Sequence, residues 1–147
     1  MNAMSGMIAT RTATVEDHDN LVKLAKTSKY TKDFSNAVMF SSPAAYAKGW
    51  IKLVENERRE VLALSCVRHK SREPKTMLYF LVVAEECRGK NIASQLLDTV
   101  MASSPHKIMQ LNVMKDNEAL KFYQKLGFAI VGEAMGGTAY ALEKEYV

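Results

Sequence analysis

The feature that most constrains the fold is a continuous apolar run, Thr76 to Ala84, that is rich in aromatic and β-branched residues. Such a run predicts a strand that is buried on both faces and lies at the centre of a sheet. A basic turn containing Gly89 follows, and apolar residues then recur at helical spacing until Pro105 approaches. Lys107 to Met114 is the next predicted strand. The segment therefore predicts one βαβ unit.

Predicted hairpins flank this unit on both sides. Trp50 to Val54 and Arg59 to Val67 are apolar runs separated by a polar stretch, which favours a hairpin. The alternative is a helix that extends from Pro43 to Asn56. Phe128 to Val147 is interrupted by Gly136-Gly137, as in a terminal hairpin. We therefore expect an α/β (α+β) fold with a mixed, mostly antiparallel central sheet flanked by helices.

Shorter elements complete this expectation. Ile8 to Thr12 is predicted to form a strand. A capping box at Thr14 to Asp17 then opens a helix that runs to about Ser28, and Tyr30 to Ser41 is predicted to form a loop. Two further helices are expected, one that begins at Ser42-Pro43 and ends at Gly49 and one from Asn117 to Leu126.

Length and composition indicate one cytoplasmic domain. Because the chain has 147 residues, we expect a single domain over residues 7–147. We interpret residues 1–6 as an artificial extension ahead of the native start. No apolar run approaches the roughly 20 residues that span a bilayer. Cys66 and Cys87 form no CxxC pair, which favours a reducing compartment and argues against a zinc site. The net charge of +4 permits an anionic partner such as nucleic acid or a phosphorylated cofactor.

The basic turn after the central strand is a candidate anion site. The first N–H groups of a helix lack internal partners and carry partial positive charge. Gly89 and the small Ala93 would let a phosphate approach the backbone, and Arg88 and Lys90 add positive charge. The alternative for this turn alone is an ordinary solvated connection.

The segments Arg88-Gly-Lys-Asn-Ile-Ala93 and Tyr123-Gln-Lys-Leu-Gly-Phe128 make the sequence resemble the GNAT superfamily of N-acetyltransferases. The family's cofactor motif, (Arg/Gln)-x-x-Gly-x-(Gly/Ala), is met at its first and last defined positions by Arg88-Gly-Lys-Asn-Ile-Ala93. A second motif, Tyr-x-x-x-Gly-Phe, is met by Tyr123-Gln-Lys-Leu-Gly-Phe128. The resemblance implies the acetyltransferase fold, acetyl-CoA as co-substrate, an amine acceptor and no metal. It implies that the cofactor is bound by Leu81, Val82, Val83, Arg88, Gly89, Lys90, Asn91, Ile92, Ala93, Ser94 and Asp116.

The resemblance also assigns chemical roles. Leu81 to Val83 would pair with the pantetheine arm where the central strand splays from its parallel neighbour. Tyr123 would be the general acid that protonates the leaving thiolate, whereas its alternative is a core aromatic. Asn91 replaces the motif's first glycine and is expected in the left-handed region. Asp116 replaces an asparagine that contacts pantetheine in many members.

Direct attack of the amine in a ternary complex is expected, because neither cysteine lies where an acyl-enzyme nucleophile would. The general base is left unassigned: Glu85, Glu86 and His69 each fit a solvated turn or loop better. Candidate pocket residues, which core packing explains equally well, are Tyr30, Phe34, Trp50 and Tyr140.

Two rival functions remain open at this stage. One is a CoA-binding module without catalysis. The other is a nucleic-acid-binding protein that uses the basic loop Arg68 to Arg72, which ranks low because no aromatic residues are interleaved with its charges. A membrane partner is not expected, and a homodimer is allowed.

Overall fold

The computed structural model describes residues 8–27 and 43–147, in which there are seven strands and four α-helices. The strands are β1 (Ile8–Thr12), β2 (Ile51–Asn56), β3 (Val61–His69), β4 (Lys75–Val83), β5 (Ile108–Met114), β6 (Ala129–Ala134) and β7 (Ala139–Glu145). The helices are α1 (His18–Ala25), α3 (Pro43–Ala47), α4 (Ile92–Ala102) and α5 (Ala119–Lys125). Short 3-10 turns lie at Val15–Asp17, Glu85–Cys87 and Met135–Gly137. The predicted loop at Tyr30 to Ser41 lies outside the described residues.

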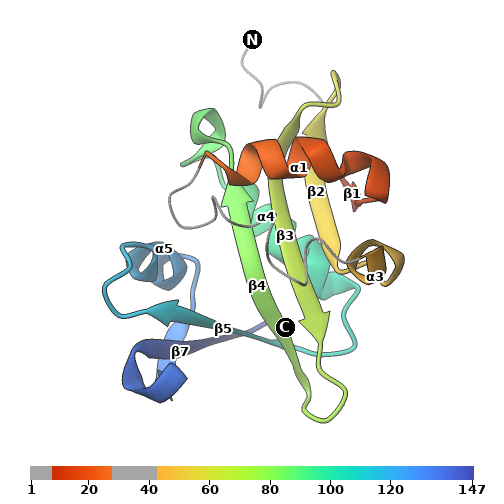
Figure 1. Ribbon diagram of the computed structural model, residues 1–147. Helices are drawn as coiled ribbons and strands as arrows, with labels where there is room; N and C mark the ends of the chain where they lie inside the picture. Colours follow the sequence, from red (N-terminus) through yellow and green to blue (C-terminus); the bar gives the residue numbers. More distant parts are fainter. Residues whose placement is uncertain (1–7, 28–42) are drawn as a thin grey trace. The chain divides into compact units, whose positions relative to one another are not determined.

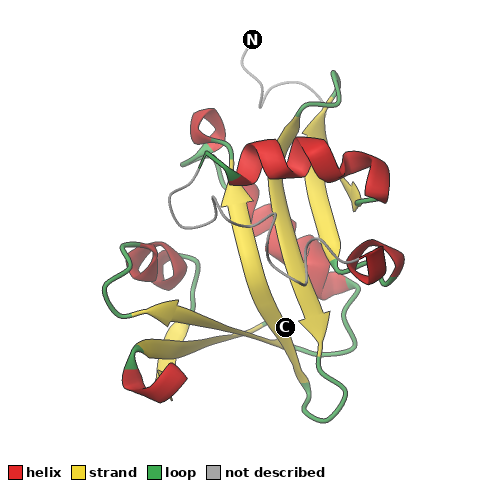
Figure 2. Ribbon diagram, viewed as in Figure 1, coloured by secondary structure: helices red, strands yellow, loops and turns green. Residues whose placement is uncertain are grey.

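The strands join in the order β1-β2-β3-β4-β5-β7-β6. The helices and strands are drawn in Figures 1 and 2. Strands β4 and β5 are parallel, with Lys75 to Met77 paired to Ile108 to Gln110, whereas β1–β2, β2–β3, β5–β7 and β6–β7 are antiparallel. The prediction of a mixed, mostly antiparallel sheet is therefore confirmed. The predicted βαβ unit is confirmed as β4, α4 and β5.

The chain divides into two compact units. Unit 1 comprises residues 1–67 and 80–100, and unit 2 comprises residues 68–79 and 101–147. Strand β4 contributes its first half to unit 2 and its second half to unit 1. The predicted site residues divide accordingly, so each unit is treated by itself.

Unit 1 buries its apolar side chains between helices and strands. Figure 1 shows α1 in front of β2 and β3 and α4 behind them. Leu21 on α1 and Leu96 on α4 are fully buried, as are Leu53 and Leu64 on the strands. Burying a leucine contributes roughly 1.5–3 kcal/mol, so the amphipathic helices are held mainly by this packing.

An ion network fixes the first elements of unit 1. The Arg11 guanidinium donates to both Asp17 carboxylate oxygens at 2.8 Å, and its Nε donates to Glu55 at 2.9 Å. Asp17 also accepts the Thr14 backbone N–H at 2.8 Å, as the capping box predicts. The network therefore ties β1, the 3-10 turn and β2 together.

Most element boundaries and the favoured β2–β3 hairpin are confirmed, whereas the expected burial of the central strand on both faces is wrong. Gly49 has a φ of +70°, and Trp50 donates to the Ala45 carbonyl at 3.0 Å, so α3 ends there and the long-helix alternative fails. Strand β4 is not buried on both faces. Its even-numbered Leu78 and Val82 are buried, whereas Tyr79 is 41% exposed. Among the described residues, no helix is long and apolar enough to cross a membrane.

Candidate functional site

The turn from β4 into α4 in unit 1 has the backbone geometry that the sequence predicts. Gly89 has a φ of +77° and Asn91 a φ of +63°, so both adopt the left-handed region. Asn91 thus takes the conformation that the usual glycine would take, and that prediction is confirmed. A Cβ built on Gly89 would meet no atom within 4 Å, so this glycine supplies backbone freedom beside open space.

Helix α4 presents its first N–H groups at this turn. Gln95 donates to the Asn91 carbonyl at 3.0 Å, which starts the helical hydrogen bonding, so the N–H groups before Gln95 lack carbonyl partners within the helix. Arg88 and Lys90 are exposed, and the Arg88 Nε donates to the Val83 carbonyl at 3.3 Å. The turn therefore combines free donors with positive charge, as an anion site requires.

The helix residues of the motif are less accessible than its turn. Ile92 is 1% exposed and Ala93 is 7% exposed, whereas Ser94 is half-buried. Ala93 therefore packs into unit 1, and any contact it makes with a ligand would come from its backbone. A large residue at position 93 would overpack the core as well as block the turn.

The end of β4 presents apolar side chains on a partly open face. Val82 is 3% exposed and points into the core, whereas Leu81 and Val83 are half-buried on the opposite face. Ala84 donates to the Leu62 carbonyl at 2.8 Å and keeps the strand end against β3. Because this face of β4 is not fully buried, apolar surface remains accessible on the segment that is predicted to contact the pantetheine arm.

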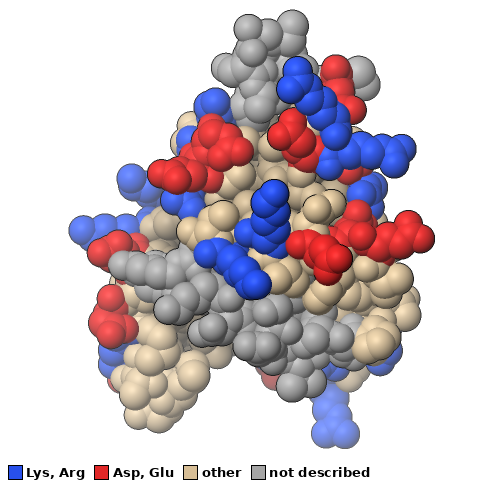
Figure 3. Space-filling model, turned by 45° about the horizontal axis from the view of Figure 1, so that its top comes forward, with Lys and Arg blue, Asp and Glu red and all other residues tan. Residues whose placement is uncertain are grey.

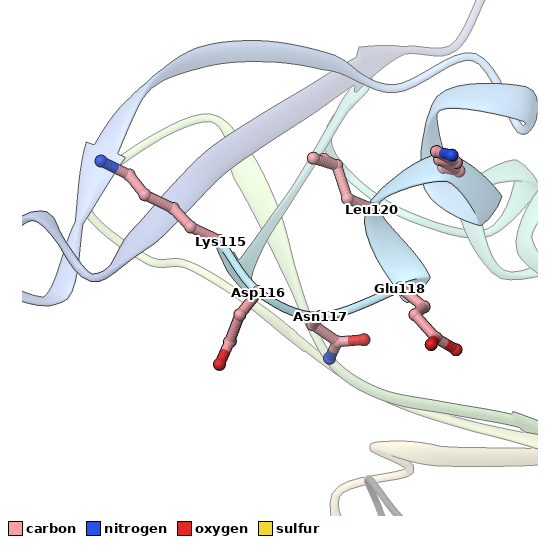
Figure 4. Close-up of a pocket in the computed structure, with 6 residues that line it drawn as sticks. Lys115, Asp116, Asn117, Glu118 and Leu120 are labelled. Atoms are coloured by element: carbon pink, nitrogen blue, oxygen red, sulfur yellow. The ribbon is translucent and has the colours of Figure 1, made fainter.

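Asp116 lies in unit 2 at a shallow pocket of about 220 Å³ (Figure 4). The pocket is lined by Lys115, Asp116, Asn117, Glu118, Leu120 and Lys121. The Asn117 side chain accepts the Ala119 N–H at 2.7 Å and so caps the start of α5. Figure 4 shows Lys115 and Asp116 pointing in different directions, and Lys115 pairs with Glu133. The helix predicted from Asn117 therefore begins two residues later, at Ala119, and Asn117 caps it.

Tyr123 on α5 combines the two roles considered for it. Its ring packs edge-on against Phe122 at 5.3 Å and Phe128 at 5.9 Å, as a core aromatic does. The residue is nevertheless half-buried, and no hydrogen bond joins its hydroxyl to another described residue. Burial raises the pKa of Tyr123 to about 12. The phenol is therefore protonated throughout the neutral range and has a donor to offer.

The other candidate groups are held in structural roles. The His18 Nδ1 lies 2.5 Å from the Tyr46 hydroxyl, and His106 Nε2 donates to the Lys70 carbonyl at 2.8 Å. Cys66 and Cys87 are both buried, and burial raises the pKa of the Cys87 thiol. Glu85 and Glu86 are exposed on their 3-10 turn. Within residues 8–27 and 43–147, no three His, Cys, Asp or Glu side chains gather to hold a metal ion.

The site residues thus form a coherent pattern within each unit. Unit 1 holds the strand segment at Leu81 to Val83 and the turn at Arg88 to Ser94, and unit 2 holds Asp116 and Tyr123. A strand that leads through a left-handed basic turn into a helix has the geometry and charge that binding a phosphate requires.

Comparison with known proteins gives the family. The profile of the acetyltransferase (GNAT) domain matches residues 48–130, which include segments of both units. The chain belongs to the GNAT acetyltransferase family, and it is an N-acetyltransferase that acts on an amine.

A curated relative gives a more particular likeness. The chain is 49% identical over 141 residues to the 5-NmdU N-acetyltransferase of Pseudomonas phage PaMx11, and the alignment covers 95% of this chain and 100% of the relative. This family and this relative favour the enzyme over the alternative of a CoA-binding module without catalysis.

Solved structures agree on the fold. The PaiA N-acetyltransferase of Thermoplasma acidophilum, whose crystal structure is a complex with coenzyme A, has a TM-score of 0.74 at 20% identity, covering 95% of this chain and 99% of its own. A GNAT acetyltransferase of Staphylococcus aureus has a TM-score of 0.78 at 12% identity, with 96% and 100% covered.

Proposed function

We propose that this enzyme transfers the acetyl group of acetyl-CoA to the amine of a modified nucleotide of the 5-NmdU type. The observation that supports this choice of acceptor is the 49% identity with the phage 5-NmdU N-acetyltransferase over that protein's full length. We further propose that residues 7–147 act as one catalytic domain in the cytoplasm. Cys87 is a buried thiol outside any disulfide, which supports a reducing compartment.

The turn from Arg88 to Ser94 holds the cofactor's pyrophosphate in this proposal. The left-handed Gly89 and Asn91 shape the backbone directly before the N–H groups that open α4. The side chains of Arg88 and Lys90 add positive charge beside these donors. The partly open apolar face at Leu81 to Val83 supports its proposed place along the pantetheine arm.

Asp116 contributes differently from the asparagine that it replaces. An ionised carboxylate accepts hydrogen bonds and cannot donate them. Asp116 is exposed at the end of β5, so in this role it accepts an N–H of the pantetheine amide.

Acetyl-CoA supplies an activated acetyl group as a thioester. The acceptor nitrogen attacks the carbonyl carbon, a nitrogen–carbon bond forms, and the carbon–sulfur bond breaks. Tyr123 donates its proton to the departing sulfur, and water takes the surplus proton of the acceptor amine. The tyrosinate then recovers a proton from water, which returns the enzyme to its starting state. Tyr123 is suited to this role because its hydroxyl has no partner among the described residues and keeps its proton up to a pKa of about 12. Since an ordinary thiol has a pKa of about 8.5, Tyr123 first stabilises the developing thiolate as a hydrogen-bond donor.

The decisive experiment supplies the purified enzyme with acetyl-CoA and the 5-NmdU nucleoside. We expect release of free CoA together with a nucleoside that has gained one acetyl group, detected by mass spectrometry. Thymidine, which lacks the amine, is the matched control and should give neither product. Turnover of simple polyamines with no turnover of the nucleoside would show that the acceptor is wrong while leaving the N-acetyltransferase intact.

A further inference from the structure

A basic surface on unit 2 has no part in the acetyl transfer described above. It is formed by the β3–β4 hairpin, residues 68–75, and by the segment between α4 and β5, residues 104–107. Together these segments hold five of the chain's 20 Lys and Arg but one of its 16 Asp and Glu. Their excess of four positive charges equals the net charge of the whole chain, so the charges of all other residues balance.

Hydrogen bonds hold the two segments together. His106 Nε2 donates to the Lys70 carbonyl at 2.8 Å, and the Ser104 and Thr76 hydroxyls lie 3.0 Å apart. His69 Nδ1 lies 2.7 Å from the Thr76 hydroxyl, which is buried. Lys70 and Lys75 close the hairpin through a backbone bond of 2.9 Å. The basic surface is therefore preorganised, which lowers the entropy lost when a ligand binds.

Neighbouring acids neutralise only part of this surface. Lys75 pairs with Glu143 at 2.7 Å, and Lys70 lies 3.5 Å from Glu73. Arg72 and Lys107 are exposed and make no ion pair with another described residue, although β7 brings Glu145 opposite Ile108.

Another face of the molecule carries side chains of both charges. On the face shown in Figure 3, positive and negative side chains are interspersed over the part that the structure describes. The basic surface is thus a local excess of positive charge.

We propose that the basic surface binds the phosphate backbone of DNA that carries the modified nucleotide. The inference rests on the proposed function, because it takes the acceptor to be presented within a DNA strand. Duplex DNA carries about one negative charge per 1.7 Å, so phosphates that flank the acceptor extend beyond any pocket for one base. Residues 68–75 and 104–107 include no Phe, Tyr or Trp on which bases could stack. In this proposal their lysine and arginine side chains contact phosphates, so the binding is independent of sequence.

The binding test compares two charge-reversed double variants. Arg72→Glu with Lys107→Glu alters the basic surface, and Lys23→Glu with Lys26→Glu makes the same change of charge at two exposed lysines near the end of α1. Fluorescence anisotropy with a labelled duplex should show affinity reduced about tenfold or more for the first variant, and a salt dependence weaker by about two counterions. The second variant should bind within about twofold of the unchanged enzyme. Equal losses in both variants would mean that net charge alone is responsible and would overturn the proposal.

Activity assays distinguish a failure of this inference from a failure of the proposed function. The first variant should acetylate the free 5-NmdU nucleoside at the unchanged rate but acetylate the same base in a duplex about tenfold more slowly at limiting DNA. Unchanged acetylation of the duplex would overturn the basic surface as a DNA site while the proposed function stands. Failure of the unchanged enzyme on both substrates would instead overturn the proposed acceptor, and the anisotropy result would still decide whether the surface binds DNA.

Discussion

Tyr123 gives the sharpest prediction at the scale of single residues. Tyr123→Phe keeps the ring that packs against Phe122 and Phe128 but removes the hydroxyl proton. Turnover should fall by about 10²-fold or more, while the melting temperature and the affinity for acetyl-CoA change little. Steady-state kinetics and calorimetry measure these quantities. Tyr146→Phe, the same change at a half-buried tyrosine that follows β7, should keep its kcat. A Tyr123→Phe enzyme retaining more than half the rate would exclude the general-acid role.

The raised pKa of Tyr123 adds a pH dependence. Tyr123 acts in its protonated form, and the pKa of its phenol is about 12. Tyr123 therefore causes no alkaline loss of activity across the neutral range. Any alkaline decline in the rate below that pKa must come from another group, and the same decline should then remain in Tyr123→Phe.

Asn91 provides a second prediction, for which the chain contains a matched control. Asn91 and Arg59 are both exposed and have φ angles of +63° and +62°. A β-branched residue is strained there, so Asn91→Val and Arg59→Val should each cost about 1–2 kcal/mol of unfolding free energy. Only Asn91→Val should also weaken acetyl-CoA binding, measured by calorimetry on the folded variants. Asn91→Gly should bind at least as tightly as the unchanged enzyme. If both valine variants bound acetyl-CoA equally well, the turn would not be part of the cofactor site.

At the scale of elements, the Arg11 network predicts an acid-dependent contribution to stability. The Arg11 hydrogen bonds lower the pKa of Asp17 below its ordinary value of about 3.9. This stabilisation is therefore present above the ordinary pKa and is lost as the pH falls through the lowered one. Arg11→Met should reduce the unfolding free energy by about 1–3 kcal/mol at neutral pH. Urea titrations from neutral to acidic pH should show the two proteins converging, and a difference independent of pH would argue for lost packing instead.

The same elements show what could be predicted from sequence. The hairpin of β2 and β3, the βαβ unit and the stop at Gly49 follow from local patterns, and all were predicted. The Arg11–Glu55 pair was not, because its partners are 44 residues apart and no local pattern connects them. The burial of β4 was overestimated because a continuous apolar run does not reveal whether one face remains open. That open face carries Leu81 and Val83, where an apolar surface suits a ligand better than a core.

For the candidate site, sequence predicted backbone geometry better than accessibility. The left-handed Asn91 follows from the conformational preference of asparagine, which is intrinsic to the residue. The burial of Ala93 depends on packing around α4 and could not be read from the motif. Ala93→Leu is consequently a poorer test of the phosphate turn than Asn91→Val, because it would lower stability and binding together.

At the scale of the whole molecule, acetyl-CoA should stabilise the native chain by mass action, since it binds the folded form alone. The proposed contacts make this prediction specific to segments. Amide hydrogen exchange should slow in residues 81–94 of unit 1 and in residues 116–123 of unit 2 when acetyl-CoA is added, because bound backbone N–H groups and ordered turns open less often. Free CoA, which keeps the pyrophosphate and pantetheine, should protect the same segments. Residues 68–75 should show no added protection from either compound and should respond to duplex DNA instead. Protection confined to residues 81–94 would remove Asp116 and Tyr123 from the acetyl-CoA site, whereas protection of the hairpin by CoA would assign the basic surface to the cofactor rather than to DNA.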